Sequence, residues 1–161
     1  FTGGSSYNET EILDKSVNVI KTSRGGKVTW HGPGQLICYL VINLNKRQKD
    51  IRKFINIIET SIMNSFKSFG IRSYSDRKNI GIWIKKNNDE MKVAALGIKV
   101  KKWITYHGFS ININNDISNY KKIIPCGIRD KSVTNLKNIN NQNYIKLPDE
   151  LIKNLIINLK T

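Results

Sequence analysis

The spacing of apolar residues predicts two amphipathic helices in this chain. Residues 49–69 repeat apolar side chains in steps of three and four and end at Gly70, a residue type that often terminates a helix. A closing segment begins Leu-Pro-Asp-Glu at residue 147 and continues with apolar residues on one face, which are Leu151, Leu155, Ile156 and Leu159. Asp116 is expected to cap a short third helix that runs to Tyr120.

Other apolar runs predict strands. Residues 35–44 are almost continuously apolar, which predicts a buried strand. Residues 80–84 and 92–100 predict two strands joined by a polar turn at residues 85–90, and the alternation over residues 109–113 predicts another. Hairpin-like neighbours are common and helices do not alternate regularly with strands, so we expect an α/β fold: a mixed β-sheet flanked by helices rather than a doubly wound parallel sheet.

Length and composition fit a single folded domain. The 161 residues and 18.5 kDa are enough for one core, and we expect one domain over residues 1–161. Apolar runs stay short of the about 18 residues that a membrane span needs, so no membrane partner is expected. The chain begins Phe-Thr-Gly-Gly without methionine, so we expect it to begin inside a longer protein whose amino-terminal part is missing here.

The net charge of +15 suggests a polyanionic partner. Lysine outnumbers arginine by 21 to 6, however, and the abundant Lys, Asn and Ile all have AT-rich codons, so nucleotide bias explains part of the charge. The densest basic cluster, Lys99, Lys101 and Lys102, has one adjacent aromatic residue, Trp103. This is a weak signal for nucleic acid, which we disfavour as a partner; an acidic protein explains the charge equally well.

The two cysteines are too few for a disulfide framework and lack metal-ligand spacing, so we expect a reducing compartment and no metal. Cys38 lies in an apolar strand run, where a small apolar side chain fits a core. Cys126 lies between Pro125 and Gly127 and is the candidate nucleophile. A thiol with a pKa of about 8.5 is mostly protonated at neutral pH, so Cys126 would need a nearby cation or base.

Three side chains are candidates for that partner. His31 and His107 both stand beside glycine in turn-like contexts, and no Asn or Asp can be placed to orient them. Lys92 begins the strand Lys-Val-Ala-Ala-Leu-Gly-Ile, whose small residues leave space beside it for a substrate. A partly desolvated ammonium within about 4 to 6 Å would lower the pKa of a thiol, and after losing a proton the same amine could act as a general base.

Residues 24–35, Arg-Gly-Gly-Lys-Val-Thr-Trp-His-Gly-Pro-Gly-Gln, are the densest cluster of special residues. Two glycine turns flank a short run, and a bare backbone of this kind lets a ligand approach closely. The spacing matches neither a phosphate-binding loop nor Gly-x-Gly-x-x-Gly, so it does not support nucleotide binding. We interpret it as a small-ligand site.

Four motifs, in this order, closely resemble the octanoyltransferases of lipoate biosynthesis, also called lipoate-protein ligase B. They are residues 24–35, residues 92–98, His-Gly-Phe-Ser at 107–110 and Pro-Cys-Gly-Ile at 125–128. The resemblance extends to the first four residues and covers essentially the whole chain. It implies the α/β fold shared with biotin and lipoate protein ligases. Trp30 departs from the Tyr or Phe usual in the family, and Ser110 from its frequent alanine.

The resemblance also implies an activity and partners. An octanoyl group would move from acyl carrier protein to a lysine on lipoyl domains of dehydrogenase complexes and on the H protein of the glycine cleavage system, without ATP or a cofactor. Cys126 would carry the acyl group as a thioester, and Lys92 would lower the pKa of its thiol and handle protons. The substrate site would be lined by Arg24, Gly25, Gly26, Lys27, Val28, Thr29, Trp30, His31, Ala95, Leu96, Gly97, Gly108, Phe109 and Ser110. The chain is expected to be a monomer.

Two alternative functions stay open. An ATP-dependent lipoate or biotin ligase would share the fold but needs no cysteine nucleophile, so Cys126→Ala would inactivate the transferase and spare the ligase. A basic nucleic-acid-binding module is supported by charge alone and would bind with steep salt dependence. We expect an intracellular location: a plastid, apicoplast or mitochondrion if the source is eukaryotic, and otherwise the cytoplasm.

Overall fold

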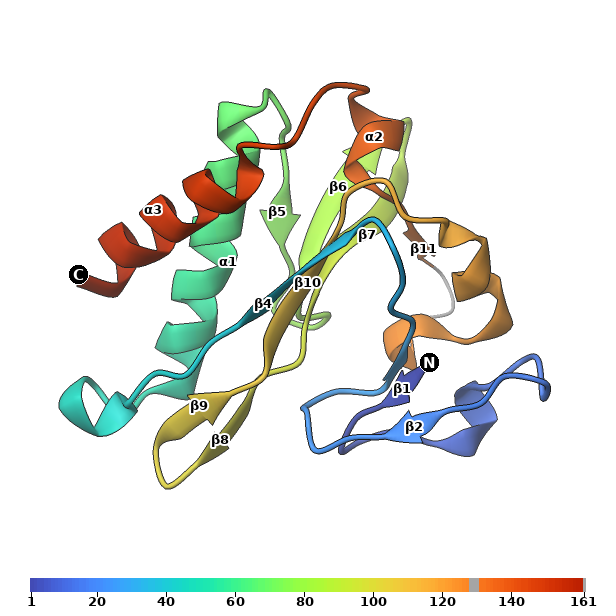
Figure 1. Cartoon of the computed structure of the whole chain (residues 1–161), viewed down its shortest axis with the longest axis horizontal. Coiled ribbons are helices and arrows are strands. Elements are labelled where there is room, and N and C mark those ends of the chain that lie inside the picture. Colours follow the sequence, from blue (N-terminus) through green and yellow to red (C-terminus); the bar gives the residue numbers. More distant parts are fainter. Residues whose placement is uncertain (128–130, 161) are drawn as a thin grey trace.

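The computed structural model describes residues 1–127 and 131–160, apart from the side chain of Cys126. A mixed central sheet forms the middle of the molecule (Figure 1), with the strand order β4-β10-β7-β6-β5. Neighbours along this order are antiparallel, and β11 pairs parallel to β7. The strands are β4 (Gln35–Tyr39), β5 (Tyr74–Ser75), β6 (Ile82–Lys86), β7 (Asp89–Leu96), β10 (Gly108–Asn112) and β11 (Ser132–Val133).

Two smaller β elements and four short 3₁₀ helices complete the loop regions. A three-stranded sheet has the order β2-β1-β3, and a hairpin joins β8 to β9. The strands are β1 (Thr2–Gly3), β2 (Ile20–Lys21), β3 (Val28–Thr29), β8 (Lys99–Lys101) and β9 (Ile104–Tyr106). The 3₁₀ helices are η1 (Glu9–Glu11), η2 (Leu44–Lys46), η3 (Ile117–Lys122) and η4 (Pro125–Gly127).

Two long helices supply one side of the core. Figure 1 shows α1 (Ile51–Ser68) and α3 (Leu147–Lys160) on one side of the central sheet, with the small sheet on the other side, while α2 (Leu136–Ile139) is a single turn. Asp50 caps α1 by accepting a hydrogen bond from the backbone N–H of Lys53 at 2.9 Å, so the helix begins two residues later than the apolar pattern. The buried faces of both helices join the apolar residues of β6, β7 and β10 in one cluster. The predicted mixed sheet flanked by helices is therefore confirmed.

The prediction of a fully buried strand at residues 35–44 is wrong. β4 lies at the end of the sheet order, and none of its five residues is fully buried. Leu36 and Cys38 pack against the core, whereas Ile37 and Tyr39 alternate with them and are exposed. A continuous apolar run predicts burial on both faces of a strand. Here the apolar residues on the outward face line a pocket instead.

Tight turns were harder to predict than strands. The strands β6 and β7 run to Lys86 and Asp89, and the turn is the pair Asn87-Asn88, with φ of 50° and 69°. Positive φ at both central residues is the geometry that favours hairpins, and Asn tolerates it. Lys102-Trp103 makes a similar turn with φ of 51° and 63°, so β8 and β9 form a hairpin that the sequence pattern did not indicate. Neither Lys nor Trp is a residue typical of such a turn.

The expected cap of the third short helix is confirmed. The carboxylate of Asp116 accepts a hydrogen bond from the backbone N–H of Ser118 at 2.9 Å at the start of η3. Over the described residues, no helix has both the length and the apolar character to cross a membrane.

Candidate functional site

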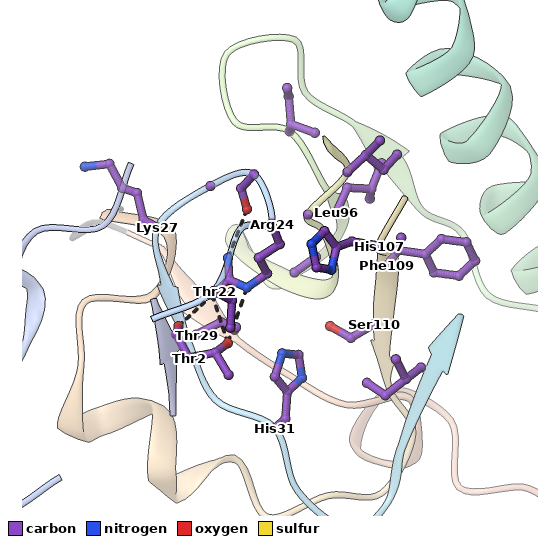
Figure 2. A pocket seen from close by; sticks show the side chains of 18 of the residues that line it. Thr2, Thr22, Arg24, Lys27, Thr29, His31, Leu96, His107, Phe109 and Ser110 are labelled. Atoms are coloured by element: carbon purple, nitrogen blue, oxygen red, sulfur yellow. Dashed lines mark hydrogen bonds between the residues drawn. The ribbon is translucent and has the colours of Figure 1, made fainter. Parts of the chain in front are cut away.

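A pocket of about 820 Å³ opens between the small sheet and the central sheet (Figure 2). One wall is the glycine-rich segment, and the other comes from the ends of β7 and β10 and the outward face of β4. Most residues predicted for the site line it: Arg24, Gly25, Gly26, Lys27, Val28, Thr29, His31, Lys92, Ala95, Leu96, Gly97, Gly108, Phe109 and Ser110. Three motifs far apart in the sequence thus meet at one cavity.

Two residues predicted for the site stand apart from this group. Trp30 does not line the pocket; its ring packs edge-on against Tyr120 with the ring centroids 5.8 Å apart, in a second apolar cluster with Val28 and Ile123. The side chain of Cys126 lies outside the described residues, although its backbone belongs to η4.

Glycines allow the two walls to meet. A side chain on Gly25 would bring its Cβ to 2.5 Å from the carbonyl oxygen of Ile98, and one on Gly108 would reach 1.9 Å from the carbonyl oxygen of Cys38. The backbone N–H of Gly25 donates to the carbonyl of Gly97 at 3.3 Å. The glycine-rich segment therefore lies directly against the end of β7, an approach that side chains would prevent.

Arg24 holds in place the pocket wall that the glycine-rich segment forms, which we call the loop wall. Its guanidinium donates to the carbonyl oxygen of Thr2 at 2.6 Å and to the Thr2 hydroxyl at 3.0 Å, bonds that are drawn in Figure 2. Another guanidinium nitrogen donates to the carbonyl of Gly25 at 3.0 Å. Arg24 thus ties β1 to the glycine turn, and we assign it a structural part in the pocket wall.

Lys92 is buried in the wall formed by the central sheet, with 6% of its surface exposed. Its Nζ donates to the carbonyl oxygen of Ile80 at 3.0 Å and lies 4.8 Å from the ring centroid of Trp83, within the range of a cation–π contact. The pairing of β6 with β7 shifts register between Ile82 and Trp83, opposite Lys92. Irregularities of this kind re-aim side chains and are frequent beside active sites.

The turn that carries Cys126 begins close to Lys92. Pro125 borders a small cavity together with Lys92 and Val133. The turn follows Ile124, whose backbone N–H donates to the carbonyl of Glu11 at 2.7 Å. The backbone of Cys126 is therefore held near the wall that contains the buried lysine.

An ion pair supports the same turn from the other side. The Lys27 ammonium lies 2.7 Å from the carboxylate of Glu11, which is buried, and the other carboxylate oxygen accepts from the backbone N–H of Val28 at 3.3 Å. A Cβ on Gly127 would come within 2.6 Å of Lys27 Nζ. The ammonium therefore packs against the residue that follows Cys126.

The remaining candidates have identifiable surroundings. Burial raises the pKa of the Cys38 thiol, which disfavours its thiolate and makes it a poor nucleophile. Desolvation lowers the pKa of His31, although its hydrogen bond with Gln35 acts in the opposite direction. His107 Nε2 lies 3.0 Å from the hydroxyl of Ser23. Within the described ranges, no group of three or more His, Cys, Asp or Glu side chains is arranged to hold a metal ion.

Sequence reasoning missed several pocket residues. Thr2, Thr22, Ile55 and the loop residues 78–80 line the cavity, as do Ile37 and Tyr39 of β4. The available signal was the continuous apolar run of residues 35–44, because apolar side chains that gather on a surface often mark a ligand-binding groove. The loop residues gave no signal, since their side chains are common at surfaces.

The fold belongs to the class of biotin and lipoate protein ligases. A bipartite lipoate protein ligase from Thermoplasma acidophilum matches with a TM-score of 0.75 at 15% identity, covering 99% of this chain and 67% of that one. A biotin protein ligase from Aquifex aeolicus matches with a TM-score of 0.61 at 18% identity, covering 79% of this chain and 53%, about half, of that one.

Sequence comparison identifies the family within this class. The model of the lipoyl protein ligase A/B catalytic domain matches residues 5–156. The octanoyltransferase of Rickettsia peacockii is 45% identical over 143 residues, and that of Wolbachia from Brugia malayi is 44% identical over 140 residues. Each match covers 86% of this chain and 68% of the relative. The chain belongs to the octanoyltransferase family, as the four motifs indicate.

Proposed function

We propose that this chain, an acyltransferase of lipoate biosynthesis by its family, carries the octanoyl group on Cys126 during transfer. The observation that carries the proposal is the burial of the Lys92 ammonium in a pocket wall that continues to Pro125, the first residue of the cysteine turn. A cation beside a thiol favours the thiolate, the nucleophilic form. The raised pKa of the Cys38 thiol leaves Cys126 as the better candidate.

The proposed reaction has two balanced steps. First, the Cys126 thiolate attacks the carbonyl carbon of a donor thioester, the new C–S bond forms, and the donor thiolate leaves. Next, a lysine amine of the acceptor attacks the acyl-cysteine, an amide bond forms, and the Cys126 thiolate leaves. As it leaves, the donor thiolate takes a proton from the Lys92 ammonium, and the neutral Lys92 amine then accepts one proton from the acceptor ammonium before attack. The second proton of the acceptor nitrogen passes to solvent when the amide forms, so the Lys92 ammonium and the Cys126 thiolate are restored; we assign the proton transfers to Lys92. Exchange of one thioester for another is nearly energy-neutral, so positioning dominates the first step.

The pocket supports binding of a medium-length acyl chain. Its wall combines the small residues Ala95 and Gly97 with the apolar side chains of Leu96 and Phe109. Each buried methylene contributes about 0.8 kcal/mol, so a cavity of limited depth discriminates between chain lengths. Backbone N–H groups of the glycine-rich segment are candidates to bind the oxyanion that forms at the carbonyl.

An acyl donor and lipoyl acceptor proteins are the partners of this family. We propose octanoyl-acyl carrier protein as the donor, with lipoyl domains of dehydrogenase complexes and the glycine cleavage H protein as acceptors. The net charge of +15 supports association with acidic proteins of this kind. The proposal includes an intracellular compartment, because a thiol nucleophile must stay reduced.

Intact-mass measurement tests the intermediate. The chain is mixed with octanoyl-acyl carrier protein without ATP, and one octanoyl adduct is expected that hydroxylamine removes. Cys126→Ser should abolish the adduct, whereas the matched control Cys38→Ser should keep it. Transfer that requires ATP and survives Cys126→Ser would instead identify an adenylate-forming ligase.

A further inference from the structure

A buried glutamate on helix α1 has no place in the mechanism above. Glu59 has 6% of its surface exposed and lies on the helix face that also buries Ile58 and Ile62. A carboxylate in such surroundings is costly unless polar groups meet it. Its position on an otherwise apolar face calls for an explanation from its contacts.

One peptide group connects Glu59 to Lys92. The backbone N–H of Gly81 donates to Glu59 Oε1 at 3.4 Å. The carbonyl oxygen of the same peptide, which belongs to Ile80, accepts from Lys92 Nζ at 3.0 Å. The carboxylate therefore meets one end of a peptide dipole, and the ammonium meets the other end. Hydrogen bonds in such a chain polarise one another and strengthen together.

Close packing around Gly81 leaves no room for a side chain at this position. Gly81 has a φ of 140°, which side chains rarely adopt. A Cβ there would lie 2.8 Å from the carbonyl oxygen of Ala94 and 3.0 Å from Lys92 Cε. The backbone thus packs directly on the lysine side chain, so a rotation of the peptide moves the acceptor that fixes Nζ.

The electrostatics agree with this connection. Desolvation raises the pKa of Glu59, and the charge of Asp76 adds to this rise. The hydrogen bond from Gly81 and the charge of Lys92 act in the opposite direction. The charge of Lys92 therefore acts on the Glu59 carboxyl, as the connection through the peptide requires.

We propose that Glu59 is a positioning residue for the acyl transfer: through the Ile80–Gly81 peptide it orients the Lys92 ammonium in the pocket wall. This inference rests on the proposed function of Lys92. Glu59 acts on the lysine through backbone, from a helix on the core side of the sheet, and need not contact the substrate.

The experiment compares three substitutions in octanoyl transfer from acyl carrier protein to a lipoyl domain. Glu59→Met removes the acceptor at similar volume and should lower kcat about tenfold with little change in KM for the donor. Glu59→Gln keeps an oxygen acceptor for Gly81 and should stay within about threefold of the wild type. Ser65→Ala, which removes another buried polar group of α1 that accepts from Asn154, is the matched control and should leave kcat unchanged.

A double-mutant cycle separates positioning from general stability. On a Lys92→Met background, Glu59→Met should cause no further loss of the residual transfer rate, because its effect passes through the lysine. Thermal melting reports whether each variant is folded. Equal kcat in Glu59→Met and the wild type would overturn the inference, as would a full additional loss on the Lys92→Met background. If the wild type forms the Cys126 adduct in either case, the proposed function stands and only the part of Glu59 fails.

Discussion

The two walls of the pocket are built in different ways. Lys92 and Ser110 lie on β7 and β10, which pair with neighbours on both sides inside the central sheet. The glycine-rich segment and the cysteine turn depend instead on separate polar contacts, such as the bonds of Arg24 to Thr2 and the pair of Lys27 with Glu11. Dense sheet pairing resists local opening more than loops held by single contacts. The position of Lys92 is thus fixed by the most stable part of the fold. The position of the loop wall is fixed by contacts that can be removed one at a time.

The largest effect on activity is expected from a substitution in the wall formed by the central sheet, which we call the sheet wall. Lys92→Met removes the ammonium but keeps an apolar side chain of similar length, so octanoyl transfer should fall by about 100-fold or more. The free energy of unfolding should hold or rise, because a buried charge is replaced by a packed apolar group. Transfer assays and urea unfolding check both expectations. Retained transfer with the usual rate would remove Lys92 from the mechanism.

The same comparison predicts unequal costs for glycine substitutions. Gly108→Ala places its Cβ 1.9 Å from a carbonyl oxygen of β4, and neither strand can move freely, so we expect a loss of about 3 kcal/mol in the free energy of unfolding. Gly26→Ala in the loop wall meets no atom closer than 3.7 Å and carries only the strain of a φ of 85°, a cost of about 1 kcal/mol.

Urea unfolding of both variants measures this difference. Ser110→Ala, which adds no atom to β10, serves as the control for the strand. Equal losses for the two glycine variants would mean that the walls do not differ in rigidity.

The sequence predicted which segments line the pocket better than it predicted which individual residues do. Ala95 and Gly97 drew attention by the space that they leave beside Lys92, whereas Gly108, Phe109 and Ser110 were assigned from the resemblance to octanoyltransferases; all five line the cavity. Trp30 could not be placed, since one step along the extended chain turns a side chain to the opposite face, and its ring joined Tyr120 instead. Glu59 could not be connected to Lys92 at all, because the link is a backbone peptide 21 residues further along the chain. The assignment of Cys126 stays a prediction.

A smaller effect is expected from the loop wall. Lys27→Met leaves the buried Glu11 carboxylate without its ion pair, but Lys27 is 43% exposed, so solvent screening limits the loss of stability to about 1 kcal/mol. Transfer should fall several-fold, because the ammonium also packs against Gly127 beside Cys126. Lys15→Met, at another exposed lysine, is the control. Activity equal to the wild type would show that the cysteine turn does not need this support.

The smallest effect concerns pH and a cluster at the rim of the sheet wall. Lys131 lies 2.7 Å from Glu90 and 3.5 Å from Asp76, with its Nζ 4.6 Å from the ring centroid of Trp83. Hydrogen bonds from Lys131 lower the pKa of Glu90, and those from Asn79 and Lys78, with a contribution from Lys131, lower the pKa of Asp76.

A carboxylate whose pKa is lower in the folded state than in the unfolded state stabilises the fold at any pH above its unfolded-state pKa. This stabilisation is lost as the pH falls through the folded-state pKa. The ordinary values are 4.5 for Glu90 and 3.8 for Asp76, so the melting temperature should begin to fall below about pH 4.5. Lys131→Met should weaken this fall in a melting series from pH 7 to pH 3, because it removes the partner that both carboxylates share. An unchanged series would show that solvent already screens the cluster, and that the rim contributes nothing to the stability of the wall that holds Lys92.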